Sequence, residues 1–405
     1  GVSCAQSERR TRQRRISAGG KNVVVWEHRI FSLLKIPMLL SSASSHPLTS
    51  LPDECFFPDR TEECARIGRF LESSNHLILT GPKGSGKTSL VLTAVRATGR
   101  PFVYVDVSQA LSVTDLAALL LQSFLSLFAP ERFRDLVAGF RAWPSITYDA
   151  ETNAFDVSFP ASANPDAVLE DVLSILEKKC DPERRLVVIL DEFQEILSLG
   201  AGLDGKLRAI LLLQENINYV FVGSRESAMT ELFENVRSPF FHFGLVMRPA
   251  ELPRDEIAQR IAEHWAPVAK EKAKDLVEKI LAVTNARPLY TRMLTEAVEE
   301  AFRREADDPA AYALDLLLSR HDLDYERRWR SFNLTNRKVL EAVSRGAPLH
   351  TVSERESTVY TAAGRLVKEG VLIRTTRYEV EDPFFALWIR RQRQRAVLSS
   401  ASPGF

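Results

Sequence analysis

Eight consecutive residues combine glycines, lysines and hydroxyl groups in a spacing that suits phosphate chemistry. They fit the pattern G-x-x-x-x-G-K-[ST] and are Gly81, Pro82, Lys83, Gly84, Ser85, Gly86, Lys87 and Thr88. Glycines let a backbone wrap closely around a polyphosphate, with its N–H groups turned toward the charge. Lys87 is expected to reach the β- and γ-phosphates, and Thr88 to place its hydroxyl on Mg²⁺. Together with the following Ser89, this P-loop predicts a site for ATP and Mg²⁺.

A pair of carboxylates follows a second apolar run. Leu186–Leu190 is uniformly apolar, as expected of a strand buried on both faces, and it ends in Asp191 and Glu192. A carboxylate at such a strand end is suited to holding the metal, and Glu192 to accepting a proton from the attacking water. The alternative is that Asp191 caps a helix and Glu192 is only solvated. The two motifs together favour ATP hydrolysis over binding alone.

A third apolar run, Tyr219–Val222, is followed by Gly223, Ser224 and Arg225. Ser224 is the candidate for sensing the γ-phosphate, because a polar group at this strand end lies near the phosphate or the water. The alternative is a helix N-cap, a position that serine favours. Arg225 is either an arginine finger or, more in keeping with its place at a helix start, a solvated side chain.

These residues need a parallel sheet to bring them together. Strands are expected at 77–79, 102–107, 186–190 and 219–222, with helices at 89–95, 113–128, 131–140 and 167–179. A polar turn at 149–153 between alternating segments predicts an inserted hairpin, either a contact element or a passive flap. Residues 255–320 have a helical pattern, with Pro253 at its start and a break at Arg287-Pro288.

The order of motifs resembles the archaeal-type ATPases, within the STAND branch of AAA+-related P-loop NTPases. Besides the P-loop, the resemblance rests on Asp191–Ile196 (DEFQEI) and Glu381–Trp388 (EDPFFALW), and it covers roughly residues 55–392. Further segments that carry it are 57–63, 104–107, 221–224 and 238–241. Arg60, in the first of these, is assigned to nucleotide binding.

The resemblance implies an α/β fold: an AAA+-like, three-layer P-loop NTPase core followed by a helical lid and a winged-helix domain. It also implies a five-stranded parallel sheet in which an extra strand separates the P-loop strand from the Asp191 strand. Two segments depart from the family pattern. His242-Phe243 stands where Gly-Arg is common, and residues 285–288 (Asn-Ala-Arg-Pro) replace a Gly-Gly-Asn-Pro-like turn.

The expected domains are a basic, disordered extension at 1–50, the ATPase core at 51–250, the lid at 251–320, the winged helix at 321–396 and a tail at 397–405. The extension is alternatively a transit peptide, a basic nucleic-acid arm or an over-extended gene start. Residues 1–50 carry a net charge of +6 and residues 320–396 also +6, within a chain of zero net charge. Basic ends on an acidic core give weak support to nucleic-acid binding.

The winged helix is expected to have helices at 336–343, 352–355 and 358–369 and two strands at 371–374 and 378–380. The last helix is expected to expose a set of polar side chains to DNA or to a protein partner: Thr358, Tyr360, Thr361, Arg365 and Lys368. Glu354 and Glu356 at its start oppose phosphate. Phe384, Phe385 and Trp388 are expected to pack this module onto its neighbour.

Composition narrows the class of protein. The cysteines, Cys4, Cys55, Cys64 and Cys180, lack the spacing of a metal site and fit reduced thiols in the cytoplasm. No apolar run approaches the roughly 18–20 residues that a membrane span needs. The set of motifs and the order of domains make a nucleotide-driven conformational switch the first hypothesis, with a DNA-binding ATPase regulator or loader second. A small-molecule kinase is disfavoured, because a kinase keeps water from its γ-phosphate. The oligomeric state stays open.

Overall fold

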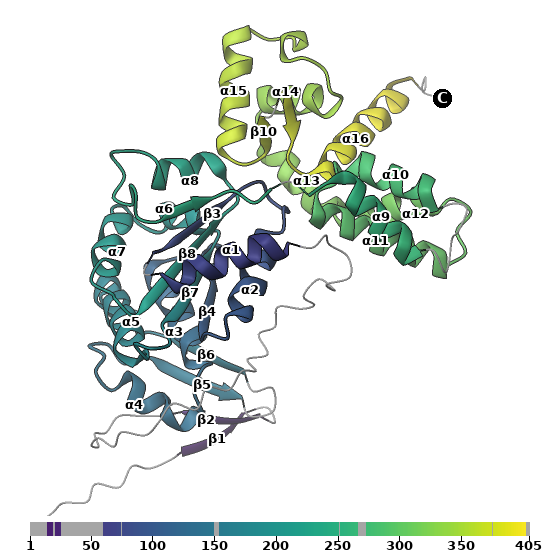
Figure 1. Cartoon of the computed structure of the whole chain (residues 1–405). Helices are drawn as coiled ribbons and strands as arrows, with labels where there is room; N and C mark the ends of the chain where they lie inside the picture. Colours follow the sequence, from purple (N-terminus) through teal and green to yellow (C-terminus); the bar gives the residue numbers. More distant parts are fainter. Residues whose placement is uncertain are drawn as a thin grey trace, which may run out of the picture.

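The computed structural model describes residues 14–18, 21–25, 60–73, 75–149, 154–250, 252–265, 273–374 and 376–401 (Figure 1). The strands are β1 (Arg14–Ala18), β2 (Lys21–Val25), β3 (Leu77–Thr80), β4 (Phe102–Asp106), β5 (Ser145–Asp149), β6 (Ala154–Ser158), β7 (Leu186–Asp191), β8 (Ile217–Gly223), β9 (Leu245–Met247), β10 (Leu372–Arg374) and β11 (Tyr378–Val380). The helices of the first half are α1 (Thr61–Glu72), α2 (Lys87–Ala97), α3 (Val113–Leu125), α4 (Phe133–Val137), α5 (Pro165–Lys179), α6 (Ile196–Leu199), α7 (Leu203–Leu211) and α8 (Glu226–Phe233).

The second half of the chain is mostly helical. Its α-helices are α9 (Arg254–Trp265), α10 (Ala273–Thr284), α11 (Pro288–Arg303), α12 (Pro309–Arg320), α13 (Asp322–Ser331), α14 (Leu334–Ser344), α15 (Glu356–Lys368) and α16 (Pro383–Ala401). Short 3₁₀ helices are η1 (Val107–Gln109), η2 (Pro130–Arg132), η3 (Phe193–Glu195) and η4 (Leu349–Thr351). None of the helices in the described ranges has the length and hydropathy that a membrane span requires.

Five parallel strands form the central sheet, in the order β4-β7-β8-β3-β9. Strand β8 therefore lies between the P-loop strand β3 and the Asp191 strand β7, as the family resemblance implied. The edge strand β9 was not predicted, because a three-residue strand leaves too short a pattern in the sequence. The parallel pairing brings the carboxyl ends of β3, β7 and β8 to one edge, where the polar residues follow.

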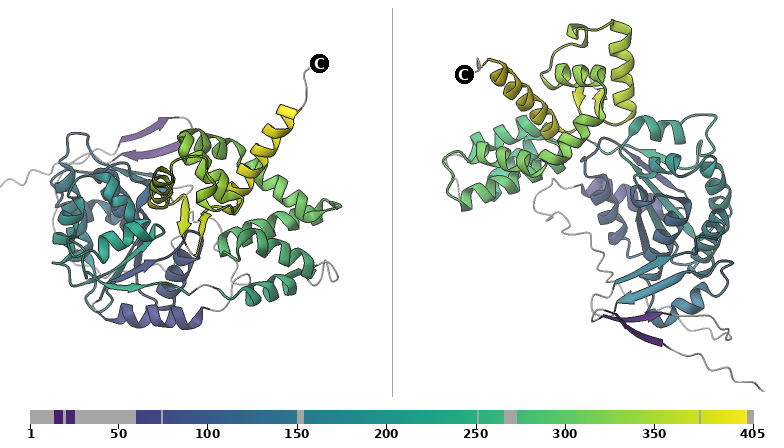
Figure 2. Two further views of the ribbon diagram at one scale, coloured as in Figure 1. Left: turned by 90° about the horizontal axis from the view of Figure 1, so that it is seen from above. Right: turned by 180° about the vertical axis from the view of Figure 1, so that it is seen from behind.

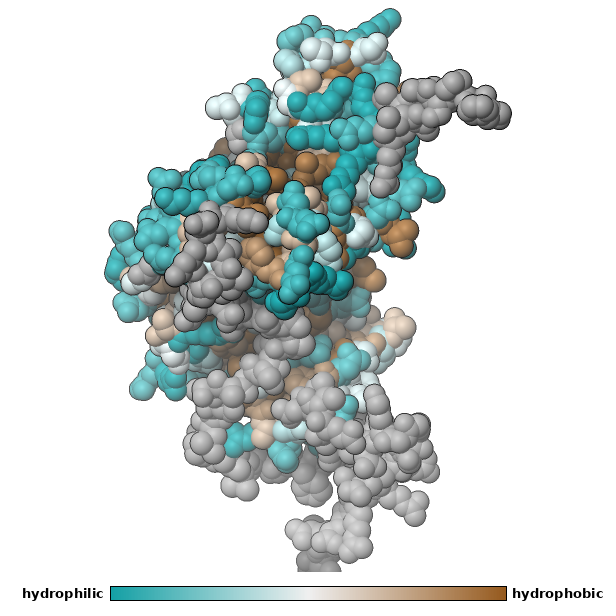
Figure 3. Space-filling model, turned by 90° about the vertical axis from the view of Figure 1, so that its right-hand side faces the viewer, coloured by the Kyte–Doolittle hydropathy of each residue, from teal (hydrophilic) through white to brown (hydrophobic). Residues whose placement is uncertain are grey.

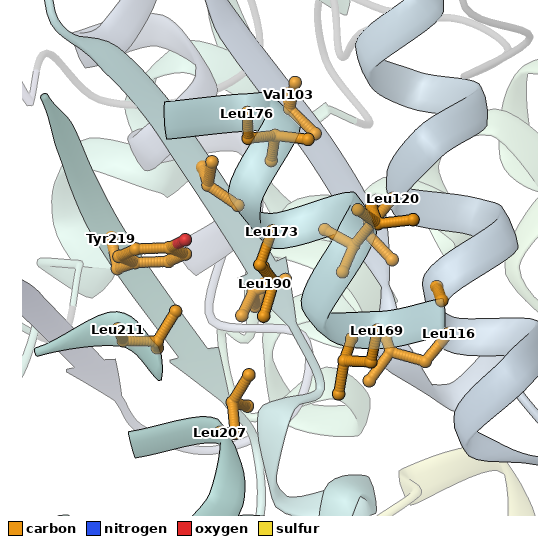
Figure 4. Packing of buried hydrophobic residues seen from close by; sticks show 14 of the residues in the cluster. Val103, Leu116, Leu120, Leu169, Leu173, Leu176, Leu190, Leu207, Leu211 and Tyr219 are labelled. Atoms are coloured by element: carbon orange, nitrogen blue, oxygen red, sulfur yellow. The ribbon is translucent and has the colours of Figure 1, made fainter. Parts of the chain in front are cut away.

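Helices cover both faces of the sheet, so the predicted three-layer core is confirmed. Helices α1 and α2 pack on one face, where the residues of β7 and β8 are Val187, Ile189, Val220 and Val222. Helices α3, α5 and α7 pack on the other face against Val103, Leu190 and Tyr219 (Figure 4). Strands β3, β7 and β8 are buried along their whole length, because each side of the sheet meets a helix layer.

The predicted hairpin is present as β5 and β6, paired antiparallel from Ser145↔Ser158 to Asp149↔Ala154. One expectation for residues 1–50 is wrong in part. Arg14–Ala18 and Lys21–Val25 are not disordered but form strands β1 and β2, and Val24 pairs with Tyr148 of β5. Pairing satisfies backbone groups that β5 would otherwise expose at a sheet edge. The rest of residues 1–50 lies outside the described residues.

Helices α9 to α12 form a group beside the sheet, and α14, α15 and the β10–β11 hairpin form another above it (Figures 1 and 2). The helices expected across 255–320 are present, and the arrangement is consistent with a lid and a winged helix. Two element predictions are wrong. Residues 352–355 are not helical; the turn is η4, which begins directly after Pro348. Residues 131–140 contain only η2 and the five-residue α4, since the helix ends at Val137.

The two helical groups share one hydrophobic core. Phe384, Phe385 and Trp388 are buried there, which agrees with the packing role expected for them. The Tyr290 and Phe384 rings meet edge to face at 5.7 Å, so α11 and α16 are joined directly. Seen from the lid side, the surface is mostly polar, with apolar side chains visible between the polar ones (Figure 3).

Candidate functional site

The P-loop connects β3 to α2, and Lys87 organises it from inside. The Lys87 Nζ donates to the carbonyl oxygens of Gly81 at 2.8 Å and Pro82 at 2.7 Å. Burial lowers the pKa of Lys87, whose side chain is only slightly exposed. Gly84 and Gly86 have φ angles of 74° and 81°, which L side chains rarely adopt. The loop therefore surrounds the Lys87 ammonium group. A bound phosphate can replace the two carbonyl oxygens as the acceptor of its hydrogen bonds.

Asp191 lies beside the loop at the end of β7 and is hydrogen-bonded on both carboxylate oxygens. Thr88 Oγ1 donates to its Oδ2 at 2.6 Å, and the Tyr104 hydroxyl donates to the same oxygen at 3.0 Å. The Glu192 N–H donates to Oδ1 at 2.8 Å. Burial raises the pKa of Asp191, and these hydrogen bonds offset part of that rise. Tyr104, on the neighbouring β4, was not among the predicted site residues.

Glu192 follows in a left-handed backbone conformation, with φ 49° and ψ 39°. Ser224 Oγ donates to its Oε2 at 2.6 Å, and Gln194 Nε2 donates to the same oxygen. The structure therefore joins Ser224 to Glu192. The alternative role considered for Ser224, the N-cap of α8, belongs to Arg225. The Arg225 guanidinium pairs with Glu195.

Arg60 holds the loop from outside. Its Nη2 donates at 3.2 Å to the carbonyl oxygens of both Ser85 and Ala250. Its Nε lies 3.4 Å from Glu63, and its Nη1 is buried without a partner in the described part of the chain. Burial lowers the pKa of Arg60. Arg60 thus bridges α1, the P-loop and the segment before the lid.

A cavity of about 780 Å³ connects these residues, a size that suits a small ligand. Of the predicted site residues, those that line it are Arg60, Lys83, Gly84, Ser85, Gly86, Lys87, Thr88, Ser89, Asp191, Glu192 and Ser224. Gly81 and Pro82 contact Lys87 instead. The lid contributes Leu252, Arg260, Pro288, Leu289 and Arg292, which sequence reasoning missed because no local motif connects them to the P-loop.

The lid also touches the P-loop through its backbone. The N–H of Leu289, at the start of α11, donates to the Gly84 carbonyl at 3.1 Å. A Cβ on Gly84 would lie 2.9 Å from Leu289 Cβ, so the absence of a side chain permits this approach. The preceding turn has φ angles of 52° at Asn285 and 54° at Ala286. Glycines would adopt these angles without strain, as in the family pattern from which this turn departs.

A buried carboxylate from the C-terminal elements lies behind this contact. Glu381 accepts from the Tyr290 hydroxyl at 3.1 and 3.2 Å and pairs with Arg287 Nη1 at 3.3 Å. The Arg287 guanidinium stacks 4.9 Å from the centre of the Tyr290 ring, with Nε and Nη2 buried and unpartnered among the described residues. Burial raises the pKa of Glu381, while Arg287 and then Lys83 of the P-loop offset part of that rise.

The oxygen donors near the loop suit a hard cation. Thr88 Oγ1 and the Asp191 carboxylate are 2.6 Å apart at the rim of the cavity, and such oxygens are ligands that Mg²⁺ accepts while keeping most of its waters. Within the described residues, no cluster of three or more His, Cys, Asp or Glu side chains forms a metal cage. The donor set therefore fits a metal that arrives with the nucleotide.

Comparison with known proteins agrees with this geometry. Residues 57–222 match the family described as the AAA ATPase domain, a range that contains the P-loop, Asp191 and Glu192. No curated protein matches the sequence.

Three solved structures are similar over most of their length. A Walker-type ATPase of Pyrococcus abyssi is 18% identical, with 82% of this chain and 95% of the other covered and a TM-score of 0.56. The Aeropyrum pernix ORC2 protein in its ADP form is 15% identical, with 86% and 98% covered and a TM-score of 0.44. The Aeropyrum pernix ORC1 protein in complex with DNA is 15% identical, with 86% and 97% covered and a TM-score of 0.45.

Proposed function

We propose that this chain, whose residues 57–222 match the AAA ATPase domain, hydrolyses ATP to ADP and phosphate and that its nucleotide state controls its conformation. The proposal is a conformational switch: the nucleotide in the P-loop controls how the lid and the C-terminal elements α14, α15 and β10–β11 sit against the core. The C-terminal elements act as a winged helix in this proposal.

The proposed site assigns a task to each polar residue. Backbone N–H groups of the Gly81–Thr88 loop, together with Lys87, hold the phosphates in place of the present carbonyl contacts. Thr88 and Asp191 would hold Mg²⁺, which neutralises charge on the phosphate oxygens when bound. Glu192 accepts a proton from the attacking water. Ser224, 2.6 Å from the Glu192 carboxylate, is placed to exchange that hydrogen bond for one to the γ-phosphate.

One observation carries the switch: a continuous set of contacts connects the P-loop to the C-terminal elements. Leu289 is hydrogen-bonded to Gly84, and the adjacent Arg287 and Tyr290 hold Glu381. Glu381 directly follows β11 and precedes α16. A nucleotide that shifts the Gly84 carbonyl therefore acts on the segment that holds the C-terminal elements.

A second contact reaches the same elements from the other side of the site. Gly370, at the end of α15, lies against Arg225, and a Cβ there would be 3.3 Å from Arg225 Cγ. Arg225 directly follows Ser224, the proposed sensor. The two contacts are small and partly polar, which is typical of interfaces that open and close within a chain.

Fluorescence energy transfer between the core and α15 tests the switch. Glu231 of α8 and Thr361 of α15 are both exposed, so cysteines at these positions can carry the dyes after replacement of the native cysteines. We expect different transfer efficiencies with ATPγS and with ADP. Lys87→Ala should respond to neither nucleotide. Equal efficiency in all nucleotide states would contradict the switch while leaving ATP hydrolysis intact.

A second candidate function is a DNA-binding ATPase regulator or loader. Its supporting observation is the exposed face of α15, where Thr358, Tyr360, Thr361, Arg365 and Lys368 are all accessible. The alternative occupant of that face is a protein partner. Duplex DNA that stimulates ATP hydrolysis at low salt, with the stimulation lost at high salt and in Arg365→Ala, would favour DNA. Hydrolysis that ignores DNA would favour the protein partner.

A further inference from the structure

Gln194 is a buried glutamine that contacts the site residue Glu192 and that the assignments above leave without a task. It lies in η3, directly after the carboxylate pair, and is 2% exposed. Its Nε2 donates to Glu192 Oε2, the same oxygen that accepts from Ser224. Two donors on one oxygen leave the other, Oε1, without a protein donor among the described residues. The Glu192 carboxylate therefore has one anchored oxygen and one available oxygen.

The orientation of the Gln194 amide is set by its neighbour. A flipped amide would direct its carbonyl oxygen at the Glu192 carboxylate and lose the hydrogen bond. In the observed orientation the Gln194 Oε1 is buried and has no partner in the described part of the chain. An unsatisfied buried acceptor is destabilising, because it has lost its hydrogen bonds to water and gained none in the protein. Stability alone does not favour a glutamine here, which points to a task for its N–H₂ group.

Gly223 makes room for this arrangement at the end of β8. A Cβ on Gly223 would lie 2.7 Å from Gln194 Oε1 and 2.3 Å from Met229 Sδ. Any side chain at this position would therefore displace Met229 first and also crowd the Gln194 amide. The backbone of Glu192 itself is left-handed, at φ 49°, so its side chain leaves the chain in an uncommon direction. Both features serve a carboxylate held in one place.

We infer that Gln194 is a positioning residue that anchors Glu192 Oε2 so that Oε1 faces the attacking water. When Ser224 transfers its hydrogen bond to the γ-phosphate, Gln194 remains as the donor that holds the carboxylate. The inference rests on the proposed role of Glu192 as the proton acceptor. Because a displacement of about 1 Å in such a group can cost on the order of a hundredfold in rate, the amide should affect turnover rather than binding.

Gln194→Met tests this, since methionine has a similar length and no donor. We expect kcat to fall at least about tenfold while KM and the affinity for ATPγS stay within about twofold. Gln214→Met is the matched control: this half-buried glutamine donates to the Leu173 carbonyl at 2.8 Å and accepts from Tyr219 at 2.6 Å, away from the cavity. It should lower the melting temperature and leave kcat unchanged.

A double variant separates positioning from general damage. With Glu192→Gln in place, adding Gln194→Met should slow turnover no further, because the anchored carboxylate is already gone. An unchanged or higher kcat in Gln194→Met would overturn the inference, as would additive losses in the double variant or loss of ATPγS binding. Normal turnover of Glu192→Gln would instead contradict the proposed role of Glu192 as proton acceptor, on which the inference about Gln194 rests.

Discussion

Two buried carboxylates, Asp191 and Glu381, have the same 6% exposure but different surroundings. Burial raises the pKa of each, and hydrogen bonds offset part of that rise. Every donor to Asp191 comes from the core: Thr88, Tyr104 and the next residue in the chain. Glu381 follows β11, but the donors that the structure shows for it come from the lid: Tyr290 of α11 and Arg287, the N-cap of that helix.

This difference separates a site built within the central sheet from a contact between the lid and the C-terminal elements. Strands β4 and β7 and the start of α2 cannot move apart without disrupting the central sheet, so Asp191 keeps its donors. Glu381 depends on two modules staying together. Arg287, its charged partner, has two N–H groups buried without partners among the described residues. The core thus holds the polar residues of the cavity, and the junction ties the lid to the C-terminal elements.

Removing the centre of the core site should have the largest effect. Lys87→Ala deletes the ammonium that organises the loop carbonyls and that is proposed to hold the phosphates. Two charge-assisted hydrogen bonds of about 1.5–3 kcal/mol each predict a loss of ATP affinity on the order of a thousandfold. Calorimetric titration with ATPγS measures it. If Lys87→Ala bound ATPγS with wild-type affinity, Lys87 would not hold the phosphates.

Glu192→Gln should separate binding from hydrolysis on the core side. We expect ATPγS to bind normally and steady-state turnover to fall at least about a hundredfold, as for loss of a general base. Phosphate release measures turnover, and the melting temperature serves as the folding control. Equal hydrolysis by wild type and variant would mean that Glu192 does not accept the proton.

The junction should respond as a charge pair between modules. Glu381→Leu leaves Arg287 buried without its carboxylate, which predicts a loss of about 3 kcal/mol in the stability of the lid and C-terminal elements. Adding Arg287→Met removes the uncompensated charge and should restore at least half of that loss. Urea unfolding of both variants measures this. A double variant no more stable than Glu381→Leu would show that the pair is not the connection.

The smallest effect is expected at Tyr104. Tyr104→Phe removes one of the hydrogen bonds to Asp191 and leaves the ring in place, so Thr88 and the Glu192 N–H still hold the carboxylate. A loss of about 1 kcal/mol predicts a roughly fivefold rise in the Mg²⁺ concentration needed for half-maximal turnover. A Mg²⁺ titration at saturating ATP tests it. A loss as large as that of Glu192→Gln would mean that the core site depends on this one donor.

The residues that could be predicted from the sequence lie in short motifs or in apolar runs. The P-loop, the Asp191-Glu192 pair and the apolar strands each occupy a short stretch, so motif and periodicity were sufficient to predict four strands and the polar residues at their ends. The three layers and the strand between the P-loop strand and the Asp191 strand were predicted from the family resemblance. Tyr104 and Gln194 lie in segments that carry the family resemblance, but nothing in the sequence assigned either residue a role, and β9 is too short to leave a period. Their partners lie across strands, where spacing along the chain contains no information.

The sequence by itself determined the type of chemistry and the main architecture, because glycines, lysine and carboxylates at strand ends admit few arrangements in a parallel sheet. Only the tertiary structure decided which lid residues close the cavity and that Glu381 meets Arg287 and Tyr290 about ninety residues away. The physical reason is that a buried polar group needs a hydrogen-bond partner, and folding can bring that partner from any part of the chain.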